Sequence, residues 1–364
     1  MKNALKISVK ILLVLVLLPF VALLFFWTKN IYYIGGTDEA NLQYLAHNKY
    51  NLGSDLAEAA PGNIAPFDSA FYTNQVFLLG ENHGFADVQQ IDKYMLLHLN
   101  KKVGLRYYVA EMDSIRANSL NTFLQKEAKD TLLLKQVVKD IKFRIPQQSS
   151  KELYEKWLAI YDYNKTLPDA LKIAVLGIDK NFNDTSRAIS RDSMMLVNFK
   201  QIIQKQGLEK EKFYGLFGYT HVLQSSFGER NIYPFAAKLK RSGLPLGNKV
   251  QSIVCLTLDS EMALPKNEQM PSPPDGKTSL VNADGPFTLV QGMEDLREVT
   301  SQHSISLFDL DNLNSPYKNS QKLAGIKVNL LGEDILPNNA NQKTTSFFQH
   351  VILVRNSKAL TSLD

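Results

Sequence analysis

Six short apolar runs recur between residues 75 and 355, and stretches with helical spacing separate several of them. The runs are Gln75–Gly80, Arg106–Glu111, Ile173–Asp179, Phe213–Gly218, Val250–Thr257 and His350–Arg355. Their apolar character is continuous rather than alternating, which is typical of strands buried on both faces of a sheet. The alternation of such strands with helices predicts an α/β fold, with a mainly parallel sheet flanked by helices.

Helix signals lie between the runs. Asp87–Lys102 has apolar residues at helical spacing and precedes Gly104, a typical helix stop. A second helix is expected from about Ser186 to Lys205, before Gly207. Residues 115–170 also have a largely helical pattern, so we expect a helical insertion that packs over the sheet.

The N-terminus contains a strongly apolar segment. From Ile11 to Trp27 there are 17 residues without a charge, close to the ~20 needed to cross a bilayer. Three lysines precede the segment and one follows it, which predicts a cytoplasmic N-terminus and a periplasmic or extracellular body. A cleaved signal peptide is the alternative, but no clear small-residue cleavage site follows. We therefore expect a single-pass anchor.

Composition limits the possible partners. The formal net charge is +5, but four lysines within residues 1–30 supply +4 of it, and the remaining 37 basic residues nearly balance 36 acidic ones. A nearly neutral body argues against nucleic acid as a partner. Cys255 is the single cysteine, so an internal disulfide and a thiolate metal cluster are excluded. The expected partners are the membrane, through the N-terminal helix, and a small-molecule or peptide substrate.

Three regions follow from these patterns. Residues 1–33 are predicted to form a cytoplasmic tip and transmembrane anchor, and residues 34–70 a linker and lead-in. Residues 71–361 are predicted to form a single α/β domain. Within that domain, residues 262–290 are rich in Pro, Gly and Asn and are expected to form a loop, or flap, near the site.

Four of the apolar runs end in side chains that can carry chemistry. Glu81 and His83 follow the first run, and Glu111 ends the second. Asp179 ends the third, and His221 follows the fourth in a Gly-Tyr-Thr-His sequence. Because the carboxyl ends of parallel strands line one crevice, where ligands bind, we expect these groups to meet at one edge of the sheet.

Two chemistries suit this set. A histidine paired with a carboxylate is a general base that can activate water, and a second histidine can act as an acid or polarise a carbonyl. We therefore predict Glu81, His83, Glu111 and His221 as catalytic residues. The same four side chains are also the possible ligands of Zn, Mn or Fe. The residues alone leave both readings open.

Further residues are predicted to contact substrate. Arg187 and Arg191 lie one turn apart on the expected helix and are suited to an anionic group, although a solvated face or pairing with Asp192 explains them equally well. Asp179 and Tyr219, both at strand ends, complete the predicted substrate-binding set.

The motifs at these residues resemble the erythromycin esterase/ChaN/TIKI-like superfamily. The matching segments are LLGENHG (Leu78–Gly84), AEMD around Glu111, GID (Gly177–Asp179), RDSMMLVN (Arg191–Asn198), FGYTH (Phe217–His221) and the ending FFQHVILVRNSKALT (Phe347–Thr361). The similarity spans roughly residues 70–361. It implies an α/β fold with the site in a crevice at the edge of the sheet.

Members of this superfamily differ in activity. Erythromycin esterases open a macrolide lactone with histidine-activated water, TIKI-like proteins are membrane-anchored metal-dependent proteases, and ChaN-like proteins are associated with haem or iron. By resemblance, Glu81 and His83 match the first motif, Glu111 the strand-end glutamate and His221 the second histidine. The first motif, G-E-N-H-G, is one residue shorter than the G-E-x-x-H-G of erythromycin esterases and closer to the ChaN and TIKI pattern.

The expected function is therefore that of a membrane-anchored extracytoplasmic hydrolase that cleaves an ester or amide bond. The alternatives are a TIKI-like metal-dependent peptidase and a non-enzymatic haem- or metal-binding surface protein. A divalent metal (Zn, Mn or Fe) or haem is the cofactor that these alternatives imply.

Overall fold

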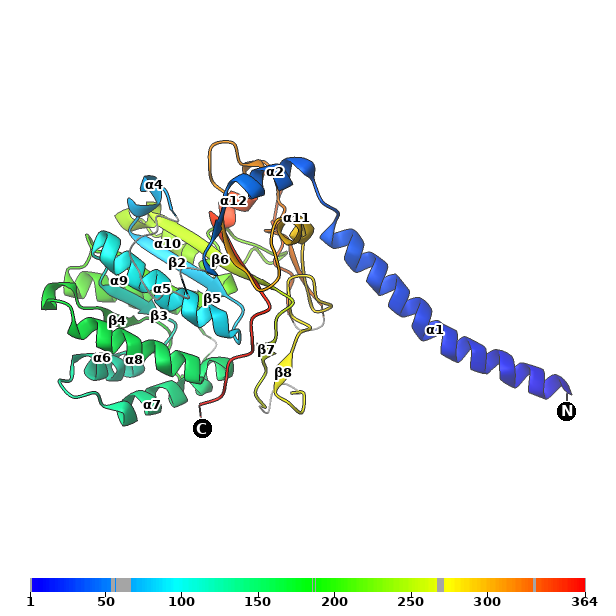
Figure 1. Cartoon of the computed structure of the whole chain (residues 1–364), viewed down its shortest axis with the longest axis horizontal. Coiled ribbons are helices and arrows are strands. Elements are labelled where there is room, and N and C mark those ends of the chain that lie inside the picture. The colour runs from blue at the N-terminus through cyan, green and yellow to red at the C-terminus, as the bar shows by residue number, and fades with distance from the viewer. Residues whose placement is uncertain are drawn as a thin grey trace.

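A computed structural model describes residues 2–53, 56, 67–184, 186, 188–266, 272–329 and 332–363, with side chains from residue 15 onward. A long N-terminal helix, α1 (Lys2–Ile34), extends away from a body built of one large sheet and its covering helices (Figure 1). The body is a mixed α/β structure, and this confirms the predicted fold class.

The central sheet has eight strands in the order β1-β10-β12-β6-β2-β5-β3-β4. The strands are β1 (Lys49–Asn51), β2 (Val76–Glu81), β3 (Tyr107–Ala110), β4 (Ala174–Gly177), β5 (Phe213–Gly218), β6 (Val250–Leu258), β10 (Ile305–Asp309) and β12 (His350–Arg355). The strands from β12 to β4 pair in parallel, whereas β10 and β1 pair antiparallel at one edge. All six predicted runs contribute strands to this sheet.

Successive residues of a strand face opposite layers, and this alternation divides the core in two. In β2, Val76 and Leu78 pack into one hydrophobic cluster and Phe77 and Leu79 into the other. One layer holds α5 (Ala86–Val103), α6 (Ser114–Gln125), α7 (Thr131–Asp140) and α8 (Lys151–Lys165). The other holds α9 (Arg191–Gln206) and α10 (Phe235–Lys240) (Figure 1). The sheet is therefore covered on both faces, as continuous apolar strands require.

Helix α9 begins five residues later than the sequence predicts. Ser190 caps it, since its side-chain oxygen accepts a hydrogen bond from the Ser193 amide (3.3 Å), and Ile189 before the cap is exposed. The helix ends at Gly207, which adopts the left-handed conformation (φ 66°) that favours glycine. The cap places Arg191 and Asp192 in the first turn of the helix.

The segment predicted as one loop over residues 262–290 contains short strands instead. β7 (Met262–Ala263) pairs with β8 (Lys277–Thr278), and β9 (Thr288–Val290) pairs with β11 (Ile326–Val328), both antiparallel. Residues 267–271 lie outside the described residues. Strands of two or three residues have no apolar run long enough to signal them, and β11 lies far from β9 in sequence.

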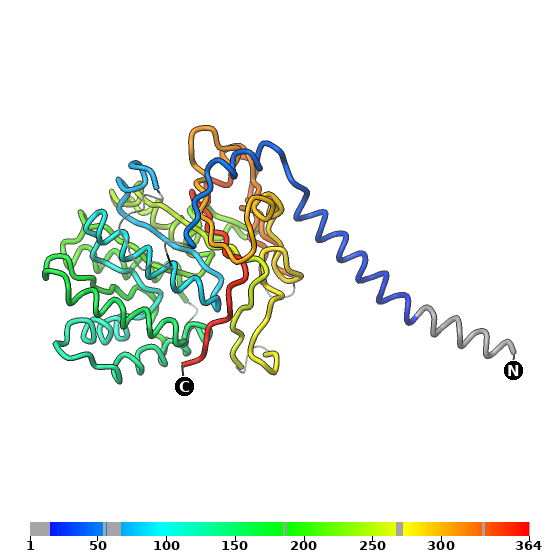
Figure 2. The backbone as a smooth tube through the Cα atoms, in the orientation of Figure 1, coloured from blue at the N-terminus to red at the C-terminus, as the bar shows by residue number. Residues whose placement is uncertain are grey.

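The predicted linker also differs from the structure. Within residues 34–70, α2 (Glu39–His47) packs on the body and β1 is an edge strand of the central sheet. The chain path in Figure 2 shows residues 34–53 running from α1 onto the body. The remaining short α-helices of the described residues are α4 (Ser69–Tyr72), α11 (Met293–Glu298) and α12 (Thr344–Phe347).

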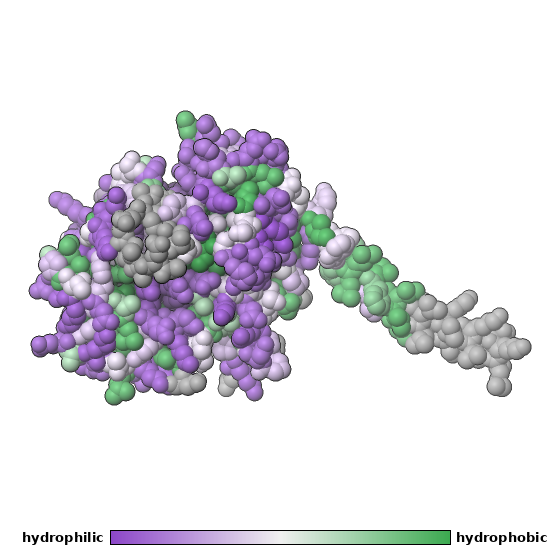
Figure 3. Space-filling view, viewed as in Figure 1, coloured by the Kyte–Doolittle hydropathy of each residue, from purple (hydrophilic) through white to green (hydrophobic). Residues whose placement is uncertain are grey.

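Helix α1 exposes its apolar side chains. Every described side chain from Leu15 to Trp27 is exposed, and Figure 3 shows this part of α1 as mostly hydrophobic beside a mostly hydrophilic body. The segment Leu15–Ile34 is long and apolar enough to cross a membrane, by length and composition.

Candidate active site

The carboxyl ends of β2, β5 and β3 bring the predicted residues together. Glu81, the last residue of β2, pairs in register with Gly218, the last residue of β5. A cavity of about 360 Å³ lies at these strand ends. Its polar lining includes Glu81, Asn82, His83, Glu111, Arg191, Gly218, Tyr219, Thr220 and His221. Thus all four predicted catalytic residues line one cavity.

Glu81 and His83 form a hydrogen-bonded pair. The Nδ1–H of His83 donates to Glu81 Oε1 (3.0 Å), and the Glu81 side chain is fully buried. The Gln148 amide donates to the same oxygen (2.5 Å) from a short 3-10 helix, Pro146–Gln148. Because Nδ1 faces the carboxylate, the neutral imidazole carries its lone pair on Nε2. Burial lowers the pKa of His83, but the hydrogen bond and charge of Glu81 outweigh it and leave that pKa raised.

Gly218 lies against both imidazoles. A Cβ atom at this position would lie 3.1 Å from His83 Nε2 and 3.5 Å from His221 Cδ2. Glycine therefore leaves His83 Nε2 the space beside the strand end that a larger residue would take. The backbone amide of Gly218 donates to Glu111 Oε2 (2.7 Å), which ties β5 to the carboxylate that follows β3.

His221 lies between two carboxylates. Its Nδ1 is 2.7 Å from Asp192 Oδ1, and its Nε2 is 3.5 Å from Glu111 Oε1. Asp192 is held in turn by the Phe235 amide, which donates to the same oxygen (2.7 Å). Burial lowers the pKa of His221, but the charge of Glu111 and the hydrogen bond to Asp192 outweigh it and raise that pKa to about 10. His221 is therefore an imidazolium at neutral pH.

Glu111 is an ionised group at the centre of the site. Its Oε1 accepts from Arg191 Nη2 (2.7 Å) while Oε2 accepts from Gly218, and the residue is buried. Burial raises the pKa of Glu111, but the nearby positive charges, His221 foremost, hold it well below its usual range. Glu111 therefore fixes two cationic groups at the cavity.

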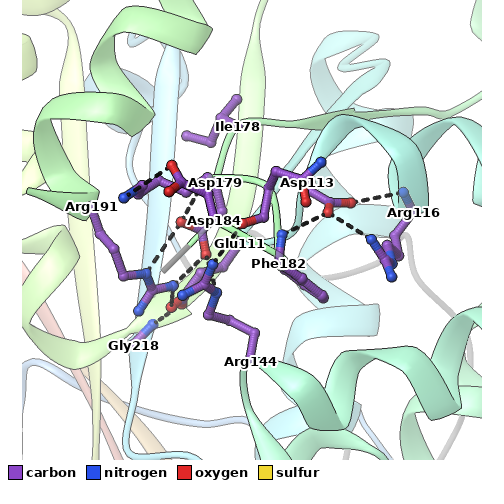
Figure 4. A network of polar contacts seen from close by, with 12 residues as sticks. Glu111, Asp113, Arg116, Arg144, Ile178, Asp179, Phe182, Asp184, Arg191 and Gly218 are labelled. Carbon is purple, nitrogen blue, oxygen red and sulfur yellow. Dashed lines mark hydrogen bonds and ion pairs between the residues drawn. The ribbon is translucent and has the colours of Figure 1, made fainter. Parts of the chain in front are cut away.

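Arg191 is held by a network of buried carboxylates, which Figure 4 shows around Asp179. Arg191 donates from Nη2 to Asp179 Oδ2 (2.5 Å) and from Nε to Asp179 Oδ1 (3.2 Å). Arg144 approaches the same carboxylate (3.6 Å). Asp179 is turned toward these guanidinium groups and is not among the residues that line the cavity. Its place is behind Arg191, which does line the cavity.

The other predicted substrate contacts have different outcomes. Tyr219 lines the cavity, and its buried hydroxyl has no hydrogen-bond partner among the described atoms. Burial raises the pKa of Tyr219 far above its usual value, so the hydroxyl stays protonated. Arg187 lies outside the described residues.

Sequence reasoning missed three contributors: Gln148, the pairing of Asp192 with His221, and the place of Gly218 between the rings. Asp192 is the second residue after the Ser190 cap of α9, and this position was a usable signal, since the first turn of a helix beside a strand end faces the crevice. Gln148 lies in an irregular part of the helical insertion, 67 residues from Glu81, and no local pattern marks it.

The predicted metal ligands already have polar partners in the structure. Both oxygens of Glu111 accept from Arg191 and Gly218, and each histidine Nδ1 faces a carboxylate. Within the described part of the chain, no group of three or more His, Cys, Asp or Glu side chains is arranged to hold a metal ion. In this arrangement the four residues do not form a ready-made metal centre, and metal binding by them stays a prediction.

A second cavity, of about 1230 Å³, lies apart from these residues. It is lined mainly by polar residues between Gln224 and Arg241 and between residues 332 and 342. None of the predicted site residues lines it. Its greater size therefore does not make it the centre of the predicted chemistry.

Comparison with known proteins shows the fold. A crystal structure of a Bacillus cereus protein aligns with a TM-score of 0.62 at 12% identity, over 88% of this chain and 98% of that chain. A mutant of the erythromycin esterase EreC in its open conformation aligns with a TM-score of 0.58 at 12% identity, over 81% and 94%. A succinoglycan biosynthesis protein aligns with a TM-score of 0.56 at 12% identity, over 88% and 97%.

No protein-family model matches the chain, and no curated protein matches it in sequence. At 12% identity, the structural likenesses establish a distant relationship of fold with these proteins, including an esterase.

Proposed function

We propose that this protein is a hydrolase that cleaves an ester or amide bond with water activated at His83. The observation that carries the proposal is the Glu81–His83 pair, whose Nδ1 is bonded to a buried carboxylate beside a cavity that also holds a protonated His221. The fold shared with an erythromycin esterase is consistent with this chemistry.

The two histidines are set for different roles. His83 and His221 are 22% and 12% exposed in their side chains, so both are accessible from the cavity. In the proposed reaction, His83 Nε2 takes a proton from water as the oxygen attacks the carbonyl carbon. Glu81 holds the ring in the required tautomer and stabilises the imidazolium that forms.

The cationic groups beside His83 complete the reaction. The negative charge that develops on the carbonyl oxygen is stabilised by the His221 imidazolium and by Arg191, which Glu111 holds at the cavity. When the tetrahedral intermediate collapses, the bond to the leaving group breaks and His83 returns its proton to that group. The products are a carboxylic acid and an alcohol or amine.

We also propose that the enzyme is anchored by α1, with its N-terminus in the cytoplasm and its body in the periplasm or outside the cell. The length and exposed apolar surface of α1 support the anchor. The lysines that precede the apolar segment support the orientation.

The test is hydrolysis of a panel of esters, amides and peptides by the full chain in detergent, beside His83→Ala. We expect His83→Ala to lower kcat/KM by ~10²–10⁴-fold, the usual contribution of a general base. His47→Ala is the matched control, because His47 is exposed on α2 and lies outside the cavity. Unchanged activity in His83→Ala would contradict the mechanism.

The same preparation separates the other readings. Activity that is lost in chelator and restored by Zn, Mn or Fe would identify a metal-dependent peptidase instead. A haem-binding protein would develop a Soret band on titration with haem and would hydrolyse nothing in the panel. We expect hydrolysis to persist in chelator, because the arrangement of Glu111 with Arg191 leaves the carboxylate engaged.

A further inference from the structure

The cavity that holds the strand-end residues has two unlike sides. One side carries the histidines, carboxylates and Arg191 described above. The other is mainly aliphatic, with Thr288 opposite Val328 as a polar member, and includes Val281, Ala283, Val290, Ile326, Val328 and Ile335. We call these six residues the aliphatic wall. Together the two sides place a charged reaction centre within about 360 Å³ of space that is bounded by hydrocarbon.

The aliphatic wall restricts what can bind beside His83. A strongly polar substrate group against it would lose hydrogen bonds to water without replacement. A hydrocarbon chain would instead gain from burial, by up to about fourfold in affinity for each buried methylene. The six wall residues carry no polar side-chain atom and no aromatic ring, and Thr288 beside them adds a single hydroxyl. This side therefore suits a flexible aliphatic chain better than a sugar or a nucleobase.

The strands that carry the aliphatic wall also contact the end of α1. Val290 belongs to β9, and the backbone of Ile34 accepts a hydrogen bond from Gly292 (2.7 Å), two residues further on. On the paired strand β11, the Lys327 ammonium lies 4.0 Å from the centre of the Tyr33 ring. The strands that form the wall are therefore the ones that meet the helix able to cross a membrane.

We propose that the substrate is an amphiphile in which an aliphatic acyl or alkyl chain adjoins the ester or amide carbonyl. This inference rests on the proposed hydrolase function and adds the substrate class. The chain lies along the aliphatic wall, while the carbonyl carbon faces His83 and the carbonyl oxygen faces His221 and Arg191. Water adds to the carbonyl, the C–O or C–N bond breaks, and the proton from water passes through His83 to the leaving group.

The first test is a series of p-nitrophenyl esters from acetyl to octanoyl, hydrolysed by the full chain in detergent below the critical micelle concentration of the esters. We expect kcat/KM to rise about twofold to fourfold with each added methylene until the cavity is filled. Hydrolysis at a rate independent of chain length would refute the inference and leave the proposed function standing. No hydrolysis of any ester or of the matching anilides would refute the proposed function itself, and this inference with it.

A substitution in the wall localises the effect. Val328→Trp narrows the cavity from β11, at a half-buried position. We expect it to lower kcat/KM for the octanoyl ester at least tenfold more than for the acetyl ester, whose continued hydrolysis also shows that the variant is folded. Val197→Trp on the exposed side of α9 is the control and should change neither. Equal losses on both esters in Val328→Trp would contradict the chain's placement along the wall.

The second test distinguishes a membrane amphiphile from a soluble acyl compound. The full chain is reconstituted in phosphatidylcholine vesicles, with a fluorogenic long-chain ester either embedded in the same vesicles or presented on albumin. Faster turnover of the embedded ester assigns the substrate to the bilayer, and faster turnover of the albumin-bound ester assigns it to solution. Hydrolysis of a short-chain ester with no turnover of the long-chain ester in either form would overturn the inference.

Discussion

At the scale of single residues, the site depends on which proton each histidine holds. Glu81 keeps the Nδ1 of His83 occupied and leaves Nε2 for substrate, whereas Asp192 and Glu111 keep His221 charged. Two histidines a short distance apart thus have opposite roles, because their carboxylate partners differ in number and position. Their raised pKa values define the pH range in which both roles are filled.

The pH dependence of hydrolysis follows from these pKa values. His83 must be neutral to act as a base, so kcat/KM should rise with pH through a pKa above 6.5. His221 must be charged, so kcat/KM should fall as pH rises through about 10. Asp192→Asn removes one negative partner of His221 and should move only the alkaline limb, toward neutral pH. We expect Asp169→Asn, at an exposed position, to move neither limb. An alkaline limb unchanged in Asp192→Asn would contradict the role given to His221.

A second residue-scale prediction concerns Gly218. Its φ of −54° suits any residue, but an added Cβ would lie 3.1 Å from His83 Nε2. Gly218→Ala should therefore displace the imidazole and lower kcat by roughly 10²-fold, the cost of misplacing a catalytic group by about 1 Å. The melting temperature should change little. Gly36→Ala, where the Cβ meets open space, is the control. Full activity in Gly218→Ala would show that the close packing of the two rings has no catalytic role.

At the scale of elements, the parallel strands position the predicted catalytic side chains. Helix α9 supplies Arg191 and Asp192, which hold Glu111 and His221. The strands could be predicted because both of their faces are buried, and their polar ends mark the site. Strand β1 escaped prediction because it has only three residues, and β10 because Ser306 and Asp309 interrupt its apolar run. The residues that hold the catalytic side chains also escaped prediction. The contacts of Gln148 and the pairing of Asp192 with His221 depend on how helices pack across the strand ends.

The cap of α9 links stability to activity at this scale. Ser190→Ala removes the side-chain acceptor at the start of the helix and should lower the free energy of unfolding by about 1 kcal/mol, measured in urea. It should also reduce kcat/KM, because Arg191 and Asp192 occupy the first turn. Asp130→Ala removes the cap of α7, far from the cavity, and should cost similar stability without loss of kcat/KM. Equal kcat/KM in the two variants would contradict the claim that the Ser190 cap positions the side chains of the site.

At the scale of the whole molecule, membrane topology can be tested by labelling. Leu313→Cys creates a thiol at a position that is 86% exposed on the body, whereas the native Cys255 is buried and its thiol pKa is raised by that burial. In intact cells stripped of any outer membrane, a membrane-impermeant maleimide should label Leu313→Cys but not the native chain. Lys2→Cys, at the other end of α1, should be labelled only after the cells are opened. The reverse pattern would contradict the proposed orientation.

The junction between α1 and the body has a mechanical consequence. Beyond the Ile34–Gly292 hydrogen bond, Asp295 accepts from the Asp38 amide and from the Asn41 side chain, both at 2.7 Å. The end of α1 and the segment that follows it are thus held to the body by several hydrogen bonds. If α1 stands in a bilayer, the reaction centre is carried at a set height and tilt above the lipid headgroups. The reaction centre would then stay within a thin layer at a fixed distance from the membrane surface. Substrate in the bilayer would reach it by lateral diffusion in two dimensions.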